Sequence, residues 1–144
     1  GYAFLNIIDM MCISIYKCIY IFVIAFITDT YAYISGMLIG KHRFTDISPK
    51  KTIEGCLIGG VMGVFIGSVY YYSLVGDLLF IKTIIMSMVL VFLSEMGDLV
   101  FSSIKRYFDK KDYSNIIPGH GGILDRFDSV IFVSLGMLIM INIL

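Results

Sequence analysis

Four long apolar stretches, separated by shorter polar segments, limit most strongly how this chain can fold. They run from about Ile13 to Ile34, Ile53 to Val75, Leu78 to Phe101 and Val130 to Leu144. A helix needs roughly 20 apolar residues to cross a bilayer, and 58% of the 144 residues are hydrophobic. The sequence therefore predicts an all-α, polytopic integral membrane protein with about four transmembrane helices. The fourth stretch is short, so its helix either begins within 123–127 or is cut at its end.

Basic residues indicate how these helices are oriented. Four of the eleven Lys/Arg lie in the loop after the first stretch and five lie after the third. These nine are Lys41, Arg43, Lys50, Lys51, Lys105, Arg106, Lys110, Lys111 and Arg126. Positive charge stays on the cytoplasmic side of membrane proteins, so both loops are predicted to be cytoplasmic. The turn at 73–77 is then outside, with Tyr70, Tyr71 and Tyr72 beside it as an expected interfacial aromatic belt.

Glycines recur every four residues along the second stretch, at Gly55, Gly59, Gly63 and Gly67. On a helix they share one face, where a neighbouring backbone can approach closely. Tight packing within the chain is the favoured interpretation, and a dimer interface is the alternative.

Four acidic residues lie at or near the predicted cytoplasmic ends of the apolar stretches: Asp29, Glu54, Glu95 and Asp98. Any one of them alone could simply be solvated at the interface. Four at one level, facing two basic loops, favour a shared polar cavity open to the cytoplasm, because charge at membrane depth is expensive unless it has a use.

A polar segment from Ser102 to Asp128 separates the third and fourth apolar stretches. Asp125 and Asp128 are three residues apart, so on a helix they share one face. Carboxylate oxygens are the ligands that Mg²⁺ prefers, together with water and substrate phosphates, and Asp98 offers a third. The alternative is a helix start at which Asp residues only favour the helix dipole.

Positive charge and a glycine-rich turn accompany these carboxylates. Lys105, Arg106, Lys111 and Arg126 suit phosphate oxygens, although basic residues also set topology. The turn 119–122, which reads Gly-His-Gly-Gly, would let backbone N–H groups approach an anion. Metals and charge neutralisation are what phosphoryl and nucleotidyl transfer require. The residues thus predict a Mg²⁺-dependent membrane enzyme acting on a phosphate-bearing lipid.

The same segment resembles the signature motif of phosphatidate cytidylyltransferases (CDP-diacylglycerol synthases). The fixed positions that match are Ser102, Ile104, Lys105, Arg106, Lys111, Asp112, Ser114, Ile117, Pro118, His120, Gly121, Gly122, Ile123, Asp125, Arg126, Phe127 and Asp128. Upstream, 29–33, 47–55 and 95–99 are also similar to the family, so the resemblance covers about residues 29–128.

The resemblance implies that CTP and phosphatidate react to give CDP-diacylglycerol and pyrophosphate. It implies Mg²⁺ ligands at Asp98, Asp125 and Asp128, with room for a second, monovalent cation. It also implies catalytic roles for those three aspartates, Lys105 and Arg106. Substrate-binding roles follow for a larger set: Ser48, Lys50, Lys51, Lys111, Asp112, His120, Gly121, Gly122 and Arg126. Asp29, Glu54 and Glu95 complete the expected polar cavity.

Family members carry further N-terminal helices, so residues 1–144 are expected to form a single membrane domain from the C-terminal part of a longer protein. The metal and phosphate site then lies mainly in 95–128. The bacterial inner membrane, with the site facing the cytoplasm, is the expected location. A homodimer is left open, and no nucleic acid is expected as a partner. The remaining alternatives are a related transferase with another lipid phosphate or polyprenol acceptor, a non-enzymatic small membrane protein, or an inactive fragment.

Overall fold

The structure is a computed structural model, and it describes residues 5, 8, 15–42, 52–107 and 124–143. Its elements are four long helices: α2 (Ile15–Ile39), α3 (Ile53–Leu74), α4 (Phe80–Tyr107) and α5 (Leu124–Ile143). Within the described residues, Ile15–Ile39, Ile53–Leu74 and Phe80–Ile104 are long and apolar enough to cross a membrane. The prediction of an all-α integral membrane protein is confirmed, although the apolar part of α5 is only 129–141.

Three helix boundaries differ from the predicted apolar stretches. Helix α2 continues five residues beyond Ile34, because Ser35 and Gly36 pack against the start of α3, where the Ser35 hydroxyl donates to the Gly55 carbonyl at 3.4 Å. Helix α4 continues to Tyr107. Helix α5 begins at Leu124, which confirms the alternative that the fourth helix begins within 123–127. Both ends of the polar segment between the last two apolar stretches are therefore helical rather than loops.

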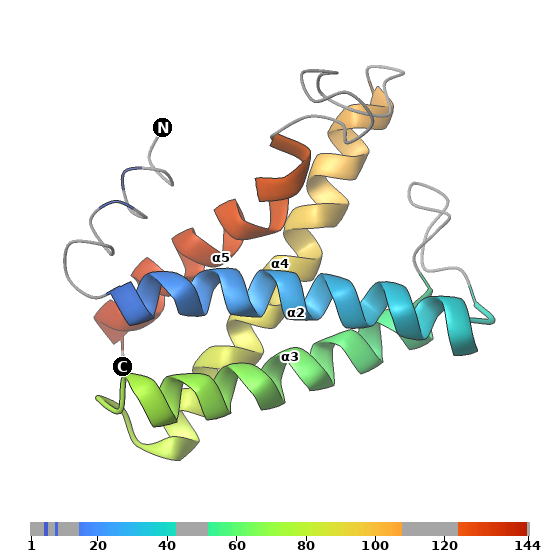
Figure 1. Cartoon of the computed structure of the whole chain (residues 1–144). Coiled ribbons are helices and arrows are strands. Elements are labelled where there is room, and N and C mark those ends of the chain that lie inside the picture. The colour runs from blue at the N-terminus through green and yellow to red at the C-terminus, as the bar shows by residue number, and fades with distance from the viewer. Residues whose placement is uncertain (1–4, 6–7, 9–14, 43–51, 108–123, 144) are drawn as a thin grey trace.

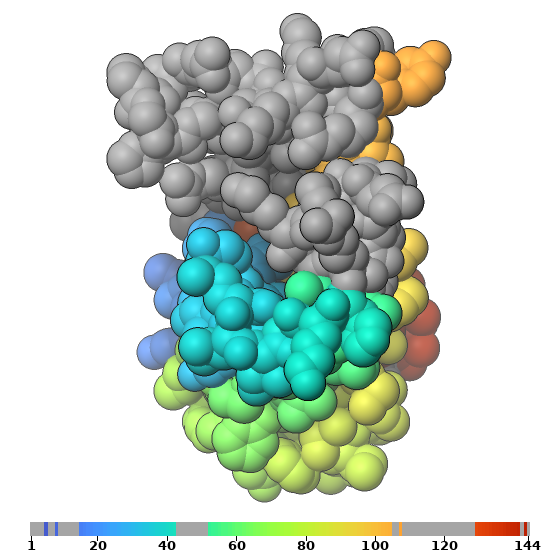
Figure 2. All heavy atoms as spheres, turned by 90° about the vertical axis from the view of Figure 1, so that its right-hand side faces the viewer, coloured from blue at the N-terminus to red at the C-terminus, as the bar shows by residue number. Residues whose placement is uncertain are grey.

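The helices form two antiparallel pairs that cross each other (Figure 1). One pair is α2 with α3, and the other is α4 with α5. Helix α4 also contacts α2 and α3, whereas α5 contacts α4 and α2. Figure 2 looks onto the end of the molecule where α2 ends and α3 begins, with α4 and α5 at the edge of that face.

The α2–α3 pair is joined along the predicted glycine face. Gly55, Gly59, Gly63 and Gly67 are all buried in this interface. A Cβ placed on Gly59 would lie 2.7 Å from both the Ala32 nitrogen and the Thr28 carbonyl oxygen. Only glycine leaves room for backbones this close, so the prediction of tight packing within the chain is confirmed.

Hydroxyl groups connect three helices inside the bundle. The Tyr20 hydroxyl (α2) lies 2.8 Å from the Ser87 Oγ (α4), and the Ser68 hydroxyl (α3) donates to that same Oγ at 3.2 Å. Tyr71 is 1% exposed and packs edge-on against the Tyr20 ring, with centroids 4.8 Å apart. The expectation that Tyr71 belongs to an interfacial belt was wrong, since its ring is buried in the core of the bundle, whereas Tyr72 is exposed.

Large apolar side chains cover much of the outer surface. Met37, Leu57, Phe65 and Phe92 each expose more than 60% of their area, as do other residues on α2, α3 and α4. Such a surface on a soluble monomer would be an aggregation hazard. Facing lipid, the same apolar surface carries no free-energy penalty, which agrees with the membrane-spanning character of these helices.

Candidate functional site

Helices α4 and α5 pack closely against each other beside Asp98. A Cβ built on Gly97 would lie 2.9 Å from the Cβ, Cγ and Cδ2 atoms of Phe132. The Phe132 ring also meets Phe101 edge-on, with centroids 6.1 Å apart. Position 128 is one helical turn before Phe132 on α5, so this contact brings the backbone positions of Asp98 and Asp128 to within about one helical turn of each other along the bundle.

Helix α2 reaches the same level through a hydrogen bond. The Ser129 hydroxyl on α5 donates to the Asp29 carboxylate Oδ2 at 3.0 Å, across 100 positions of sequence. Ser129 is 1% exposed, and Asp29 is half-buried. A hydrogen bond to a charged group in partly buried surroundings is among the stronger side-chain contacts in proteins. The residue that directly follows Asp128 is therefore fixed to α2.

Further polar groups are buried close to Asp29 and Asp98 in the sequence. The hydroxyl oxygens of Thr28 (α2) and Ser94 (α4) are buried and have no hydrogen-bond partner among the atoms that the structure describes. The Thr28 oxygen faces α3, where it occupies the place a Cβ of Gly63 would take. Buried hydroxyls normally find a partner or a water, so this part of the bundle offers polar groups to bound water or ligand.

Glu54 has a different environment from Asp29. Its carboxylate accepts hydrogen bonds from the backbone N–H groups of Lys41 and His42, both at 3.3 Å, and lies 2.6 Å from the His42 ring nitrogen Nδ1. The Ile53 N–H donates to the His42 carbonyl at 3.1 Å, and Thr52 caps α3 by accepting from the Gly55 N–H at 3.1 Å. Glu54 thus ties together the two chain ends from which 43–51 departs and to which it returns.

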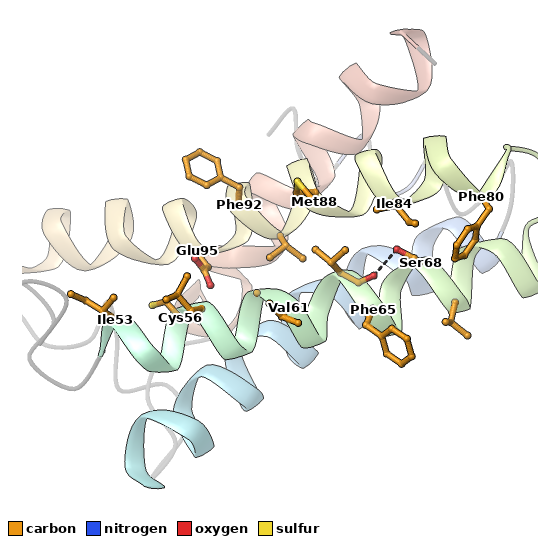
Figure 3. Close-up of a pocket in the computed structure, with 15 residues that line it drawn as sticks. Ile53, Cys56, Val61, Phe65, Ser68, Phe80, Ile84, Met88, Phe92 and Glu95 are labelled. Carbon is orange, nitrogen blue, oxygen red and sulfur yellow. Dashed lines mark hydrogen bonds between the residues drawn. The ribbon is translucent and has the colours of Figure 1, made fainter. Parts of the chain in front are cut away.

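An apolar groove of about 670 Å³ separates α3 from α4 (Figure 3). Its walls are mainly aliphatic and aromatic side chains, such as Val61, Phe65, Ile84 and Met88. Glu95 reaches into the groove from α4 at the end where Ile53 and Cys56 lie. A groove of this kind suits hydrocarbon along its length, with a polar group at the Glu95 end.

The four cavity acids meet different partners in the structure. Glu95 lines the groove, Asp29 accepts from Ser129, and Glu54 binds the turn at 41–42. Asp98 is half-buried beside the Gly97–Phe132 contact. A single cavity shared by all four stays a prediction.

Many predicted site residues lie outside the described residues. Those in 43–51 and 108–123 are Ser48, Lys50, Lys51, Lys111, Asp112, His120, Gly121 and Gly122. Lys105, Arg106, Asp125, Arg126 and Asp128 belong to described helical backbone, but their side chains are outside the description. Their roles stay predictions.

The predicted Mg²⁺ ligands are on two helices that pack against each other. Among the residues whose side chains are described, no three His, Cys, Asp or Glu gather as a metal site, and two of the three predicted ligands fall outside that set. Asp98 is on α4 beside the Gly97–Phe132 contact with α5, and positions 125 and 128 are in the first two turns of α5. The side chains at positions 125 and 128 lie outside the description, so a Mg²⁺ site built from these three carboxylates stays a prediction.

Sequence reasoning missed Ser129, Gly97 and Phe132. Ser129 is a small polar residue directly after Asp128, at the start of an apolar run, and Gly97 stands directly before Asp98. Small residues on membrane helices mark close contacts, and that signal was available for Gly97. The partner of Ser129 was not readable, because it lies 100 positions away.

Comparison with known proteins gives one family and several relatives. Residues 2–144 match the cytidylyltransferase family. The "Phosphatidate cytidylyltransferase" of Staphylococcus haemolyticus (strain JCSC1435) is 43% identical over 116 residues, which are 80% of this chain and 45% of the relative. The protein of the same name from Staphylococcus saprophyticus subsp. saprophyticus is 41% identical over 143 residues, covering 92% and 52%. That of Bacillus subtilis (strain 168) is 38% identical over 137 residues, covering 92% and 51%. The chain spans about half the length of these curated relatives.

Proposed function

This chain belongs to the cytidylyltransferase family, and we propose that it contains the catalytic part of a phosphatidate cytidylyltransferase. The reaction is CTP plus phosphatidate giving CDP-diacylglycerol plus pyrophosphate. The observation that carries the proposal is the unbroken match of the motif from Ser102 to Asp128. It is joined by relatives of that name at 38–43% identity. The packing of α4 against α5 beside Asp98 supports it, because this contact draws the two halves of the motif together.

The transfer needs no general base in the protein. A phosphate oxygen of phosphatidate, already anionic, attacks the α-phosphorus of CTP. The new P–O bond forms as the bond between the α-phosphorus and the bridging oxygen breaks, and pyrophosphate leaves with the bonding electrons. The task of the chain is then to bind, orient and neutralise, which is how proteins catalyse this class of reaction.

Three aspartates and several basic residues divide that task. Asp98, Asp125 and Asp128 would hold Mg²⁺, which when bound would neutralise the triphosphate and stabilise charge on the departing pyrophosphate. Lys105 and Arg106 would bind phosphate oxygens, Arg106 through its planar fork. The basic residues of 43–51 and the turn 119–122 would hold the rest of the nucleotide phosphates. A monovalent cation in the same cavity is compatible with this ligand set.

The groove between α3 and α4 would hold an acyl chain of phosphatidate. Its α3 wall extends from Ile53 to Val69, which at the helical rise is about 24 Å, most of the apolar thickness of a bilayer. Glu95 closes one end and is three residues before Asp98 on α4, so a lipid in the groove would present its phosphate near the predicted metal ligands.

The protein would act on the cytoplasmic face of the bacterial inner membrane. Six of the eleven Lys/Arg lie in the two segments that join α2 to α3 and α4 to α5, and three more lie at the adjoining ends of α4 and α5. Positive-inside behaviour places all nine on the cytoplasmic side. A cysteine introduced at Tyr113, with the native cysteines removed, should resist an impermeant thiol reagent in intact cells. Labelling from outside would reverse the proposed orientation.

The experiment that tests the function is a substrate assay. The protein, purified in detergent with the sequence that flanks this chain in its gene, should convert labelled CTP and phosphatidate to CDP-diacylglycerol when Mg²⁺ is present. A polyprenyl phosphate in place of phosphatidate should give no product. Turnover with the polyprenyl phosphate alone would support the related transferase instead, and absence of turnover with either acceptor would contradict the proposal.

A further inference from the structure

We propose that Asp29 is a positioning residue that sets the place of the predicted metal-binding aspartates through its hydrogen bond from Ser129. The inference rests on the proposed function, because it assigns a role relative to that same site. It concerns a contact between α2 and α5 that is separate from the motif itself.

The register of α5 links Ser129 to the predicted metal ligands. Ser129 directly follows Asp128 and is four residues after Asp125, so position 125 and Ser129 share one helix face, one turn apart. A sliding or rotation of α5 would move positions 125 and 128 together with Ser129. The bond from the Ser129 hydroxyl to the Asp29 carboxylate, 3.0 Å long, opposes both movements.

Few neighbouring helices hold the start of α5 in place. Helix α5 contacts α4 and α2 but not α3 within the described residues. Gly97 and Phe132 fix it against α4, one turn after Asp128. Contact with α4 alone would leave α5 free to roll about that line. Helix α2 supplies the second contact, and within it the bond to Asp29 holds the residue next to position 128.

The burial of Ser129 makes its hydrogen bond to Asp29 difficult to replace. Ser129 is 1% exposed, so a hydroxyl that lost the carboxylate would lose a strong acceptor in surroundings where water cannot easily replace it. Residues that orient metal ligands without touching the metal typically change metal affinity by about 10–100-fold when they are removed. Asp29 and Ser129 fit that description, since their bond holds the backbone that carries two of the three predicted ligands.

The test measures Mn²⁺ binding, used as a probe for Mg²⁺, by the electron paramagnetic resonance signal of free Mn²⁺ added to the purified protein. Ser129→Ala and Asp29→Ala should each weaken Mn²⁺ binding by about tenfold or more, and the double variant should be no weaker than either one. Asp29→Asn keeps an oxygen that accepts from Ser129, so its affinity should stay within about threefold of wild type. As a control on the same helix, Ser134→Ala also removes a buried hydroxyl but should bind Mn²⁺ normally.

Two results would overturn the inference alone. Normal Mn²⁺ binding by Ser129→Ala, while Asp125→Asn abolishes binding, would show that the bond does not position the site. Equal losses for Asp29→Asn and Asp29→Ala would make the Asp29 carboxylate itself a ligand. In contrast, undiminished Mn²⁺ binding by Asp125→Asn would remove the proposed metal site, and this inference would go with it. Thermal unfolding of each variant in detergent shows whether a loss of binding merely reflects loss of fold.

Discussion

Gly97 of α4 and Phe132 of α5 lie in direct contact, with no room for a methyl group on Gly97. The contact is one residue from Asp98 and one helical turn from Asp128. It therefore fixes the distance between the two helices that carry the predicted metal ligands. Because close-packed interiors transmit even a one-carbon change, adding a methyl group at Gly97 should disturb the predicted site.

Gly97→Ala should lower the turnover of the molecules that remain folded, in addition to lowering the stability of the protein. Its Cβ would overlap the Cβ and ring carbons of Phe132 at 2.9 Å, and the start of α5 would have to move. Overpacking of this kind costs about 1–3 kcal/mol. Gly136→Ala is the matched control, because it crowds the flexible ends of Leu90 and Leu93 in the same helix pair, away from Asp128. Equal turnover per folded molecule in the two variants would contradict the assigned role of Gly97.

Alanine should destabilise the protein at Gly59 but have little effect at the neighbouring Gly60. A Cβ on Gly59 would lie 2.7 Å from backbone atoms of α2, whereas one on Gly60 would meet its nearest neighbours at 3.6 Å, an ordinary contact. Gly59→Ala should therefore destabilise the protein by about 1–3 kcal/mol, while Gly60→Ala should stay within about 0.5 kcal/mol. Thermal unfolding in detergent measures both, and equal stability of the two variants would show that the glycine face is not a tight interface.

Gly60→Leu should impair the use of phosphatidate but not of CTP. The new side chain would enter the groove beside Glu95 and Val91, where the acyl chain is proposed to lie. Excluding two or three methylene groups, at about 0.8 kcal/mol each, should raise KM for long-chain phosphatidate roughly tenfold or more. Gly60→Ala is the control that leaves the groove open. An unchanged KM for phosphatidate in Gly60→Leu would mean that the substrate lies elsewhere.

At the opposite end of the bundle, Lys17 and Asp77 form an ion pair of 2.5 Å that ties α2 to the turn between α3 and α4. Partial burial raises the pKa of Asp77, but hydrogen bonds from Lys17 and Tyr71 outweigh it, so the net pKa lies below its ordinary value of 3.8. A depressed carboxyl pKa contributes stability above the unfolded-state pKa, and the contribution is lost as pH falls through the folded-state pKa.

Asp77→Asn should therefore be less stable than wild type above about pH 5. The difference should stay below roughly 1 kcal/mol because the pair is partly exposed. It should shrink as the pH falls below 4. Unfolding temperatures in detergent between pH 3 and 8 provide the measurement. A stability gap that persists unchanged down to pH 3 would show that the ion pair is not its source.

The sequence predicts the helices and the glycine face well, because both depend on periodic patterns that are local. Apolar length identified Ile53–Leu74 to within one residue, and the four-residue spacing identified the buried face of α3. The start of α5 at Leu124 lies within the predicted 123–127, but the helix ends at 39 and 107 were not predicted. Polar residues continue a membrane helix beyond the hydrocarbon without any change in helical propensity. Hydropathy alone marks where the apolar run ends, not where the helix ends.

The sequence predicts the candidate site as a set of residues, whose roles stay predictions, but it does not predict the contacts that these residues make. The motif selects Asp98, Asp125 and Asp128 by spacing and resemblance, whereas the bond between Asp29 and Ser129 depends on how α2 crosses α5. Glu54 shows the same limit: its position predicted a place in the cavity, but it did not predict the hydrogen bonds to the backbone at 41–42. Contacts between distant segments follow from the crossing of helices, which no local pattern records.

The most direct test of the central claim is the turnover of Asp125→Asn. The substitution keeps the size of the side chain and removes one anionic metal ligand, so membrane insertion and unfolding temperature should match wild type. The measurement is the rate at which the purified protein, with its flanking sequence, forms CDP-diacylglycerol from labelled CTP and phosphatidate across a Mg²⁺ titration. Activity should fall by orders of magnitude, and added Mg²⁺ should not restore it. Near-normal, Mg²⁺-dependent turnover by Asp125→Asn would contradict both the metal site and the mechanism built on it.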